Sequence, residues 1–205
     1  MSCQLDTSEL VELLQQSAVE HLTKFRQLES QEFSAVDGVG IVTTDFEALY
    51  AYKCGEYQRC LQFSTHNIHT LLAGGIPAFI LSYPEFIQLM DDNIASLIGL
   101  TLIVNMSSRE HPEHFVISQL SLLLYLMSQC QMKLHHSATS LAQTLDRVEV
   151  ARRKPVCQVF TLDQLLLKLT ERNIQRYLVI IQQCFTISGT PRQPLSSVFS
   201  SHEYI

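Results

Sequence analysis

The stretch Phe115–Met132, with the sequence FVISQLSLLLYLMSQCQM, contains no Asp, Glu, Lys or Arg over eighteen residues. A run of this length is compatible with a helix that spans a membrane or with a helix buried inside a protein. Three glutamines and three serines interrupt the run, and each of them is unfavourable in hydrocarbon. We therefore predict a buried core helix from about 112 to 134 and keep a membrane-associated helical protein as the alternative.

The composition of the whole chain favours a helical fold. Of the 205 residues, 46% are hydrophobic and only 17% are charged, so the chain is too apolar to remain disordered. It contains 7 Gly and 6 Pro, which is too few for the many tight turns of a β-sandwich or barrel. The charged fraction is below the roughly 25% of an average globular protein, which points to apolar surface that a partner covers. We predict an all-α protein.

Charge and cysteine content argue against several classes of function. The formal net charge of −6 disfavours nucleic-acid binding, because phosphate recognition needs a basic surface. Six cysteines in a chain of this length are typical of reduced thiols and not of a disulfide scaffold. The segment Met1–Asp6 has no basic region followed by an apolar run, so we predict no secretory signal. These features together predict a cytoplasmic protein that does not bind nucleic acid.

Helical periodicity predicts a single all-helical domain over 1–185, followed by a disordered tail over 186–205 that is rich in Ser and also contains Pro and Gly. Capping pairs such as Thr161 with Gln164 mark the helix starts. We expect antiparallel helical hairpins, arranged as a repeat array or as an irregular bundle. The expected helices number about seven and cover 7–30, 44–54, 57–72, 84–105, 112–134, 138–153 and 162–185.

Glycine, proline and acidic residues give further local predictions. Two glycines fall within 33–42, which predicts a loop there. Pro84 suits the first turn of a helix. On that helix the adjacent Asp91 and Asp92 would diverge, and we expect both to lie on a solvated face.

One predicted hairpin resembles a known repeat. Residues Tyr52–Leu61, YKCGEYQRCL, are similar to the middle of a tetratricopeptide repeat, where an aromatic-Lys-x-Gly-acidic-Tyr turn joins two helices. Gly55 permits the sharp turn, Tyr57 packs back, and the small Cys60 lets the two helices approach closely. The likeness covers about 44–71. It implies a helical scaffold that binds peptides or partner helices.

The same hairpin supplies the predicted partner-binding residues. Tyr50, Lys53, Tyr57, Asn67 and His69 are expected to line a groove that binds another protein or peptide; the chain could also associate with a second copy of itself. We predict no catalytic residue, no cofactor and no metal, since the sequence lacks nucleophile-elbow, Cys-x-x-Cys and phosphate-loop motifs. The predicted function is a non-catalytic protein–protein interaction module or scaffold.

The remaining alternative is a metal-dependent enzyme that uses paired histidines. His66 and His69 could share one face of a helix, and His111 and His114 flank a helix start. Zinc requires ligands that converge on one point. Cys60 lies six positions before His66, which places it off the same helical face. The spacing therefore disfavours a zinc site.

Overall fold

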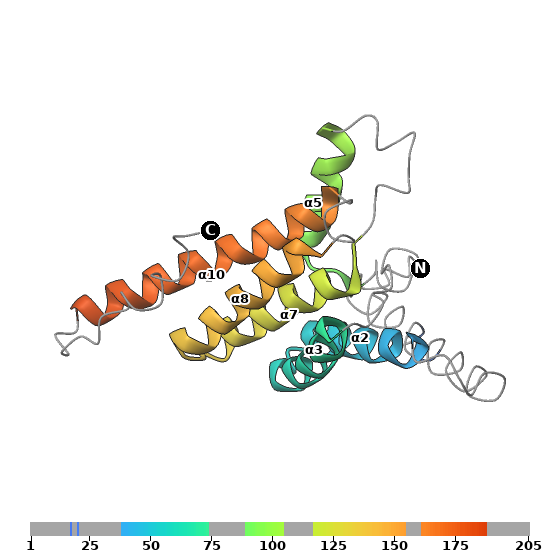
Figure 1. Ribbon diagram of the computed structural model, residues 1–205, viewed down its shortest axis with the longest axis horizontal. Helices are drawn as coiled ribbons and strands as arrows, with labels where there is room; N and C mark the ends of the chain where they lie inside the picture. Colours follow the sequence, from blue (N-terminus) through green and yellow to red (C-terminus); the bar gives the residue numbers. More distant parts are fainter. Residues whose placement is uncertain are drawn as a thin grey trace, which may run out of the picture.

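The computed structural model describes residues 38–73, 89–104, 117–154 and 161–187, together with Ser17 and Glu20. Within these residues the regular elements are six helices and no strand, which confirms the predicted all-α class (Figure 1). The six helices are α2 (Gly38–Lys53), α3 (Tyr57–Leu72), α5 (Asp92–Val104), α7 (Gln119–Lys133), α8 (Ala138–Arg153) and α10 (Thr161–Ile187).

Two of the predictions fall largely outside the described residues. Of the predicted helix over 7–30, only Ser17 and Glu20 are described, and both are helical. The predicted tail over 186–205 lies outside the described residues from 188 onward, and its first two residues belong to α10. The described part therefore holds six helices where about seven were expected for the whole chain.

Helix α7 is the centre of the bundle. It packs against α2, α3, α8 and α10, and it runs through the middle of the molecule in Figure 1. Every residue over 117–128 is buried, including the polar ones, so the prediction of a buried core helix is confirmed for this segment. The helix begins at Gln119 and not near 112, because the hydroxyl of Ser118 accepts a hydrogen bond from the backbone N–H of Ser121 and caps the first turn.

Helices α2 and α3 form the predicted hairpin, which turns at Gly55. This glycine has a φ of +77°, a left-handed conformation that costs other residues energy. The backbone N–H of Glu56 donates to the carbonyl of Ala51 at 2.8 Å and closes the turn. The rings of Tyr52 and Tyr57 meet edge to face, with centroids 5.8 Å apart. The turn is therefore formed by residues that lie within a few positions of one another, which is why the sequence predicts it.

The start of α2 differs from the prediction. The helix begins at Gly38, so the expected loop over 33–42 is wrong from that residue onward. A glycine within a helix costs only about 1 kcal/mol relative to alanine. Burial of Phe46 and Leu49 on the same helix stabilises it by more than that, since each fully buried apolar side chain contributes about 1.5–3 kcal/mol.

Helix α5, in contrast to α2, starts later than expected. The predicted helix over 84–105 is interrupted at Asp91, which precedes α5 and caps it: the carboxylate accepts a hydrogen bond from the backbone N–H of Ile94 at 2.9 Å. The hydroxyl of Tyr125 on α7 donates to the same carboxylate at 2.5 Å. Asp91 therefore ties α5 to the core and does not lie on a solvated face as predicted. Asp92 is exposed.

Helices α8 and α10 complete the bundle beside α7. Helix α8 covers the predicted range 138–153, and the hydroxyl of Ser137 caps its first turn. Helix α10 packs against both α7 and α8. Ile174 and Leu178 of α10 bury against Leu141 of α8 in an apolar cluster separate from the main core. The two helices therefore close one side of the central helix.

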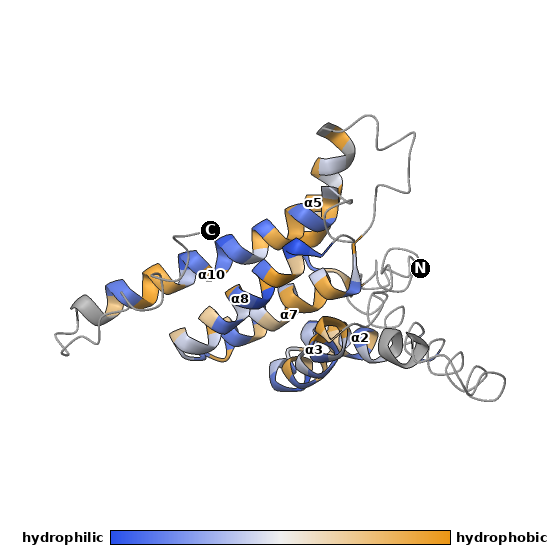
Figure 2. Ribbon diagram, in the orientation of Figure 1, coloured by the Kyte–Doolittle hydropathy of each residue, from blue (hydrophilic) through white to orange (hydrophobic). Residues whose placement is uncertain are grey.

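The distribution of apolar residues follows this packing. Figure 2 shows hydrophobic residues along α7 and an alternation of hydrophobic and hydrophilic stretches along α10. Helix α10 buries one face and exposes the other, as a partly apolar helix at the edge of a bundle does, whereas α7 is buried on all sides over 117–128. Among the helices that the structure describes, none combines the length and the apolar character that crossing a membrane would require.

Candidate functional site

The five predicted partner-binding residues do not share one surface. Tyr50 and Tyr57 are half-buried and pack against the main core, while Lys53 is exposed at the end of α2. His69 is exposed on α3. Asn67, in contrast, is only 2% exposed. Asn67 is therefore a core residue, and its predicted place on a groove surface is wrong.

Asn67 belongs to a buried polar cluster between three helices. Its side-chain amide donates to the carboxyl group of Asp45 on α2 at 2.5 Å, and the amide of Gln119 on α7 donates to the other oxygen. Burial raises the pKa of Asp45 from its ordinary value of 3.8 to about 8, while the two hydrogen bonds act in the opposite direction. This cluster joins α2, α3 and α7, and Asp45, with an exposure of 0%, does not reach the surface.

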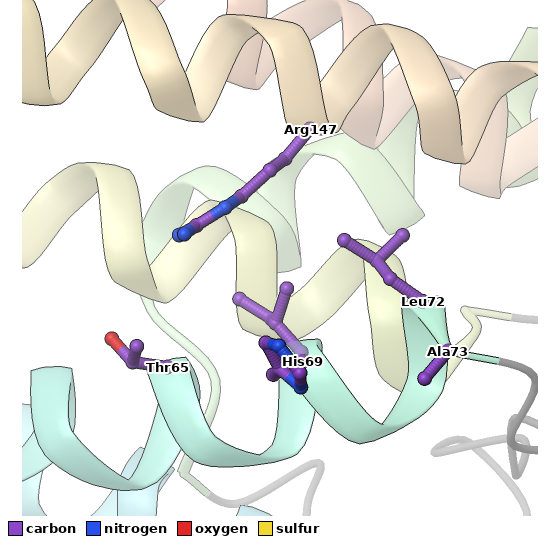
Figure 3. A pocket seen from close by; sticks show the side chains of 6 residues that line it. Thr65, His69, Leu72, Ala73 and Arg147 are labelled. Atoms are coloured by element: carbon purple, nitrogen blue, oxygen red, sulfur yellow. The ribbon is translucent and has the colours of Figure 1, made fainter.

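A cavity of about 310 Å³ lies between α3 and α8 and is the candidate site (Figure 3). Figure 3 shows α3 along one side of it and Arg147 entering from α8 on the other. The lining residues are Thr65, Ile68, His69, Leu72, Ala73 and Arg147.

The α3 wall of the cavity follows from helical spacing. Thr65, His69 and Leu72 are separated by four and three positions, so their side chains lie along one face of α3. Ile68 lies beside them and is 1% exposed, which anchors this wall in the core. The wall thus combines apolar groups with one imidazole and one hydroxyl. Of the five predicted residues, only His69 lines the cavity.

Arg147 is the distinctive group on the α8 side. Its side chain extends from α8 across the gap toward α3 (Figure 3). One guanidinium nitrogen contacts the sulfur of Met127 at 3.4 Å. Within the part of the chain that the structure describes, no carboxylate pairs with Arg147, whereas the neighbouring Arg152 and Arg153 pair with Glu171 and Glu149. The guanidinium therefore has donor capacity available to a ligand in the cavity.

A lysine at the end of α8 fixes the two helices to each other. The ammonium group of Lys154 donates to the backbone carbonyl of Leu71 on α3 at 2.8 Å. This carbonyl belongs to the last turn of α3, where orphan carbonyls accept from basic side chains. Because α3 and α8 also flank α7, their separation is set by packing on both sides. The cavity is therefore a preformed feature of the bundle.

The residues considered for a metal site do not converge. Among the described residues, no group of three or more His, Cys, Asp or Glu side chains is placed to hold an ion. His66 and His69 are exposed, and Cys60 is buried. The Cys60 thiol forms a hydrogen bond with Cys130 on α7, which lowers the pKa of Cys60. This thiol therefore faces α7 and not the histidines. The other pair, His111 and His114, lies outside the described residues.

Comparisons with known proteins give no relative for this arrangement. The chain matches no protein-family model, no curated protein and no solved structure.

Proposed function

We propose that this protein is a non-catalytic interaction module, and that the cavity between α3 and α8 receives side chains of a protein partner. The observation that carries the proposal is the composition of the cavity wall, which combines the apolar Leu72 and Ala73 with the guanidinium of Arg147. Ligand sites in proteins combine apolar walls with a small number of directed polar groups in this way. His69 contributes a second polar group, its imidazole ring.

The packing of the walls supports this proposal. Both helices that form the cavity pack on α7, and the contact between Lys154 and Leu71 holds their ends together. A preformed site costs a ligand less free energy, because few protein groups have to be ordered on binding. A cavity of about 310 Å³ admits the side chains of a peptide segment.

We extend the proposal to the hairpin architecture. The tetratricopeptide-like turn at Gly55 joins α2 to α3, and a second short turn joins α7 to α8. In scaffolds built from helical hairpins, partners bind surfaces to which successive hairpins contribute. Here α3 belongs to one hairpin and α8 to the other, which fits a site formed between hairpins. The tetratricopeptide-like motif at Gly55 and the turn between α7 and α8 support this architecture.

Blocking the cavity tests the function directly. Thr65 lines the cavity, while Thr70 lies on another face of α3; both are exposed, and each hydroxyl donates to the carbonyl four residues earlier. Thr65→Trp should fill the cavity, and Thr70→Trp is the matched control. A library of random peptides displayed on phage is selected against the full chain, and the recovered peptides are then measured against both variants.

We expect recovered peptides to bind the wild-type chain and Thr70→Trp within about twofold, and to bind Thr65→Trp at least about tenfold more weakly. Thermal denaturation followed by circular dichroism checks that both variants are folded. Recovery of no peptide, or peptides that bind Thr65→Trp as well as the wild type, would show that the cavity is not a partner site.

A further inference from the structure

We infer that the cavity between α3 and α8 recognises a carboxylate, supplied by an Asp or Glu side chain of a peptide that also presents an aliphatic side chain. This inference rests on the proposed function and assigns the chemistry of the ligand. Arg147 would bind the carboxylate, and Leu72 with Ala73 would contact the aliphatic group.

The charges around the cavity are the first argument. Helix α3 contains no Asp or Glu, and neither does α7 beneath it. On α8, Glu149 is bound to Arg152 and Arg153, and Asp146 is exposed one position from Arg147, about 100° around the helix. Among the residues that line the cavity, the basic side chains are Arg147 on α8 and His69 on α3. In a chain of net charge −6, the cavity wall is thus free of carboxylates and favours an anionic ligand.

The geometry of the guanidinium is the second argument. Arginine presents five N–H donors in a planar fork, and two parallel donors match the two oxygens of a carboxylate. The contact of Arg147 with the sulfur of Met127 uses one nitrogen and leaves the others available. Figure 3 shows that the side chain lies in the gap between the helices. Arg147 is therefore held ready for a ligand that enters between α3 and α8.

The number of cationic side chains favours a carboxylate over a phosphate group. Phosphopeptide sites gather several arginines around the dianion. Here one arginine enters the cavity, and the ammonium group of Lys154 is bound to the carbonyl of Leu71. A single planar fork beside an apolar wall suits a singly charged carboxylate next to an aliphatic side chain.

Selection of peptides tests the ligand class. The phage library of random peptides is selected in parallel against the wild-type chain, Arg147→Glu and the control Arg172→Glu. Arg172 is exposed on α10, so its substitution makes the same change of charge outside the cavity. We expect Asp or Glu beside Leu, Ile, Val or Met to be enriched on the wild type and on the control, and Lys or Arg to replace the acids on Arg147→Glu.

A double-mutant cycle measures the contact itself. One recovered acidic peptide and its Glu→Gln twin are titrated against the wild-type chain and against Arg147→Gln by fluorescence anisotropy. We expect the Gln peptide to bind the wild type about tenfold more weakly and to bind Arg147→Gln as tightly as the Glu peptide does. Circular dichroism confirms that each variant is folded.

The two proposals fail in different ways. Peptides that lose binding on Thr65→Trp but show no acidic preference, and no response to Arg147→Gln, would overturn the carboxylate inference and leave the site standing. Peptides that do not respond to Thr65→Trp would overturn the site and the inference together.

Discussion

The side-chain amide of Asn67 on α3 lies 2.5 Å from a carboxyl oxygen of Asp45 on α2, in a part of the core where neither side chain is more than 2% exposed. Gln119 on α7 donates to the second oxygen of the same carboxyl group. The consecutive helices α2 and α3 and the more distant α7 therefore meet on one ionisable group. Such a group links the stability of the fold to pH.

The raised pKa of Asp45 makes the folded state less stable as the pH rises. Burial raises the pKa of Asp45 to about 8, whereas the carboxyl group has a pKa near its ordinary value of 3.8 in the unfolded chain. Its contribution to stability is therefore fully present below pH 3.8 and is lost as the pH rises toward 8. Between pH 5 and 7 we expect this group to lower the free energy of unfolding by about 1 kcal/mol per pH unit. Urea denaturation at several pH values measures it.

Two variants isolate this effect. Asp45→Asn removes the titration and keeps the size of the side chain, so its loss of stability with rising pH should be smaller than that of the wild type. Asp146→Asn, which changes an exposed carboxylate on α8, should keep the slope of the wild type. Parallel pH profiles for Asp45→Asn and the wild type would contradict the assignment of the raised pKa.

The turn at Gly55 gives a prediction with an internal control. Gly55 has a φ of +77°, so Gly55→Ala should lower the free energy of unfolding by about 1 kcal/mol. Gly99 lies within α5, and an added methyl group would meet no atom within 4 Å. Gly99→Ala should therefore raise the free energy of unfolding by up to about 1 kcal/mol. Chemical denaturation compares them, and equal effects of the two substitutions would refute the argument.

The bond between Tyr125 and Asp91 predicts an energetic coupling. The tyrosine hydroxyl donates to Asp91, and the side-chain amide of Asn93 donates to the hydroxyl at 3.1 Å. Burial, together with the charge of Asp91, raises the pKa of Tyr125, so the hydroxyl remains a donor at neutral pH. Tyr125→Phe and Asp91→Asn should each cost about 1–3 kcal/mol.

The double variant separates this contact from general damage. If the two groups act through one bond, Tyr125→Phe with Asp91→Asn should cost less than the sum of the single changes, by about 1 kcal/mol. Asp92→Asn alters the exposed neighbour and should change stability by only a few tenths of a kcal/mol. Additive effects of the two single substitutions in urea denaturation would count against a direct bond.

Local signals in the sequence were sufficient to predict part of the fold. The hairpin turn at Gly55 and the bounds of α8 were predicted closely, because a glycine in the turn and a serine cap act within a few residues. The start of α5 was missed, since the carboxylate of Asp91 is held by Tyr125, 34 residues further along the chain. Contacts at such separations leave no periodic signal in one sequence.

The candidate site was predicted only in part, because it too depends on contacts between residues that are far apart in the sequence. His69 was predicted from the hairpin that contains it, while Asn67, two residues earlier, was assigned to the surface although it bonds to Asp45 in the core. Arg147 was missed because nothing near it in sequence distinguishes it from Arg152 and Arg153. Only the placement of α3 and α8 on α7 shows that Arg147 enters a cavity and the other two do not.

Helix α7 constrains how this protein can change over generations. Because the whole segment 117–128 is enclosed by neighbouring helices, replacement of almost any of its side chains disturbs close packing. The outer face of α3 and the flank of α8 carry no such restriction. Inherited substitutions can therefore accumulate around the cavity while the frame that separates its walls stays intact.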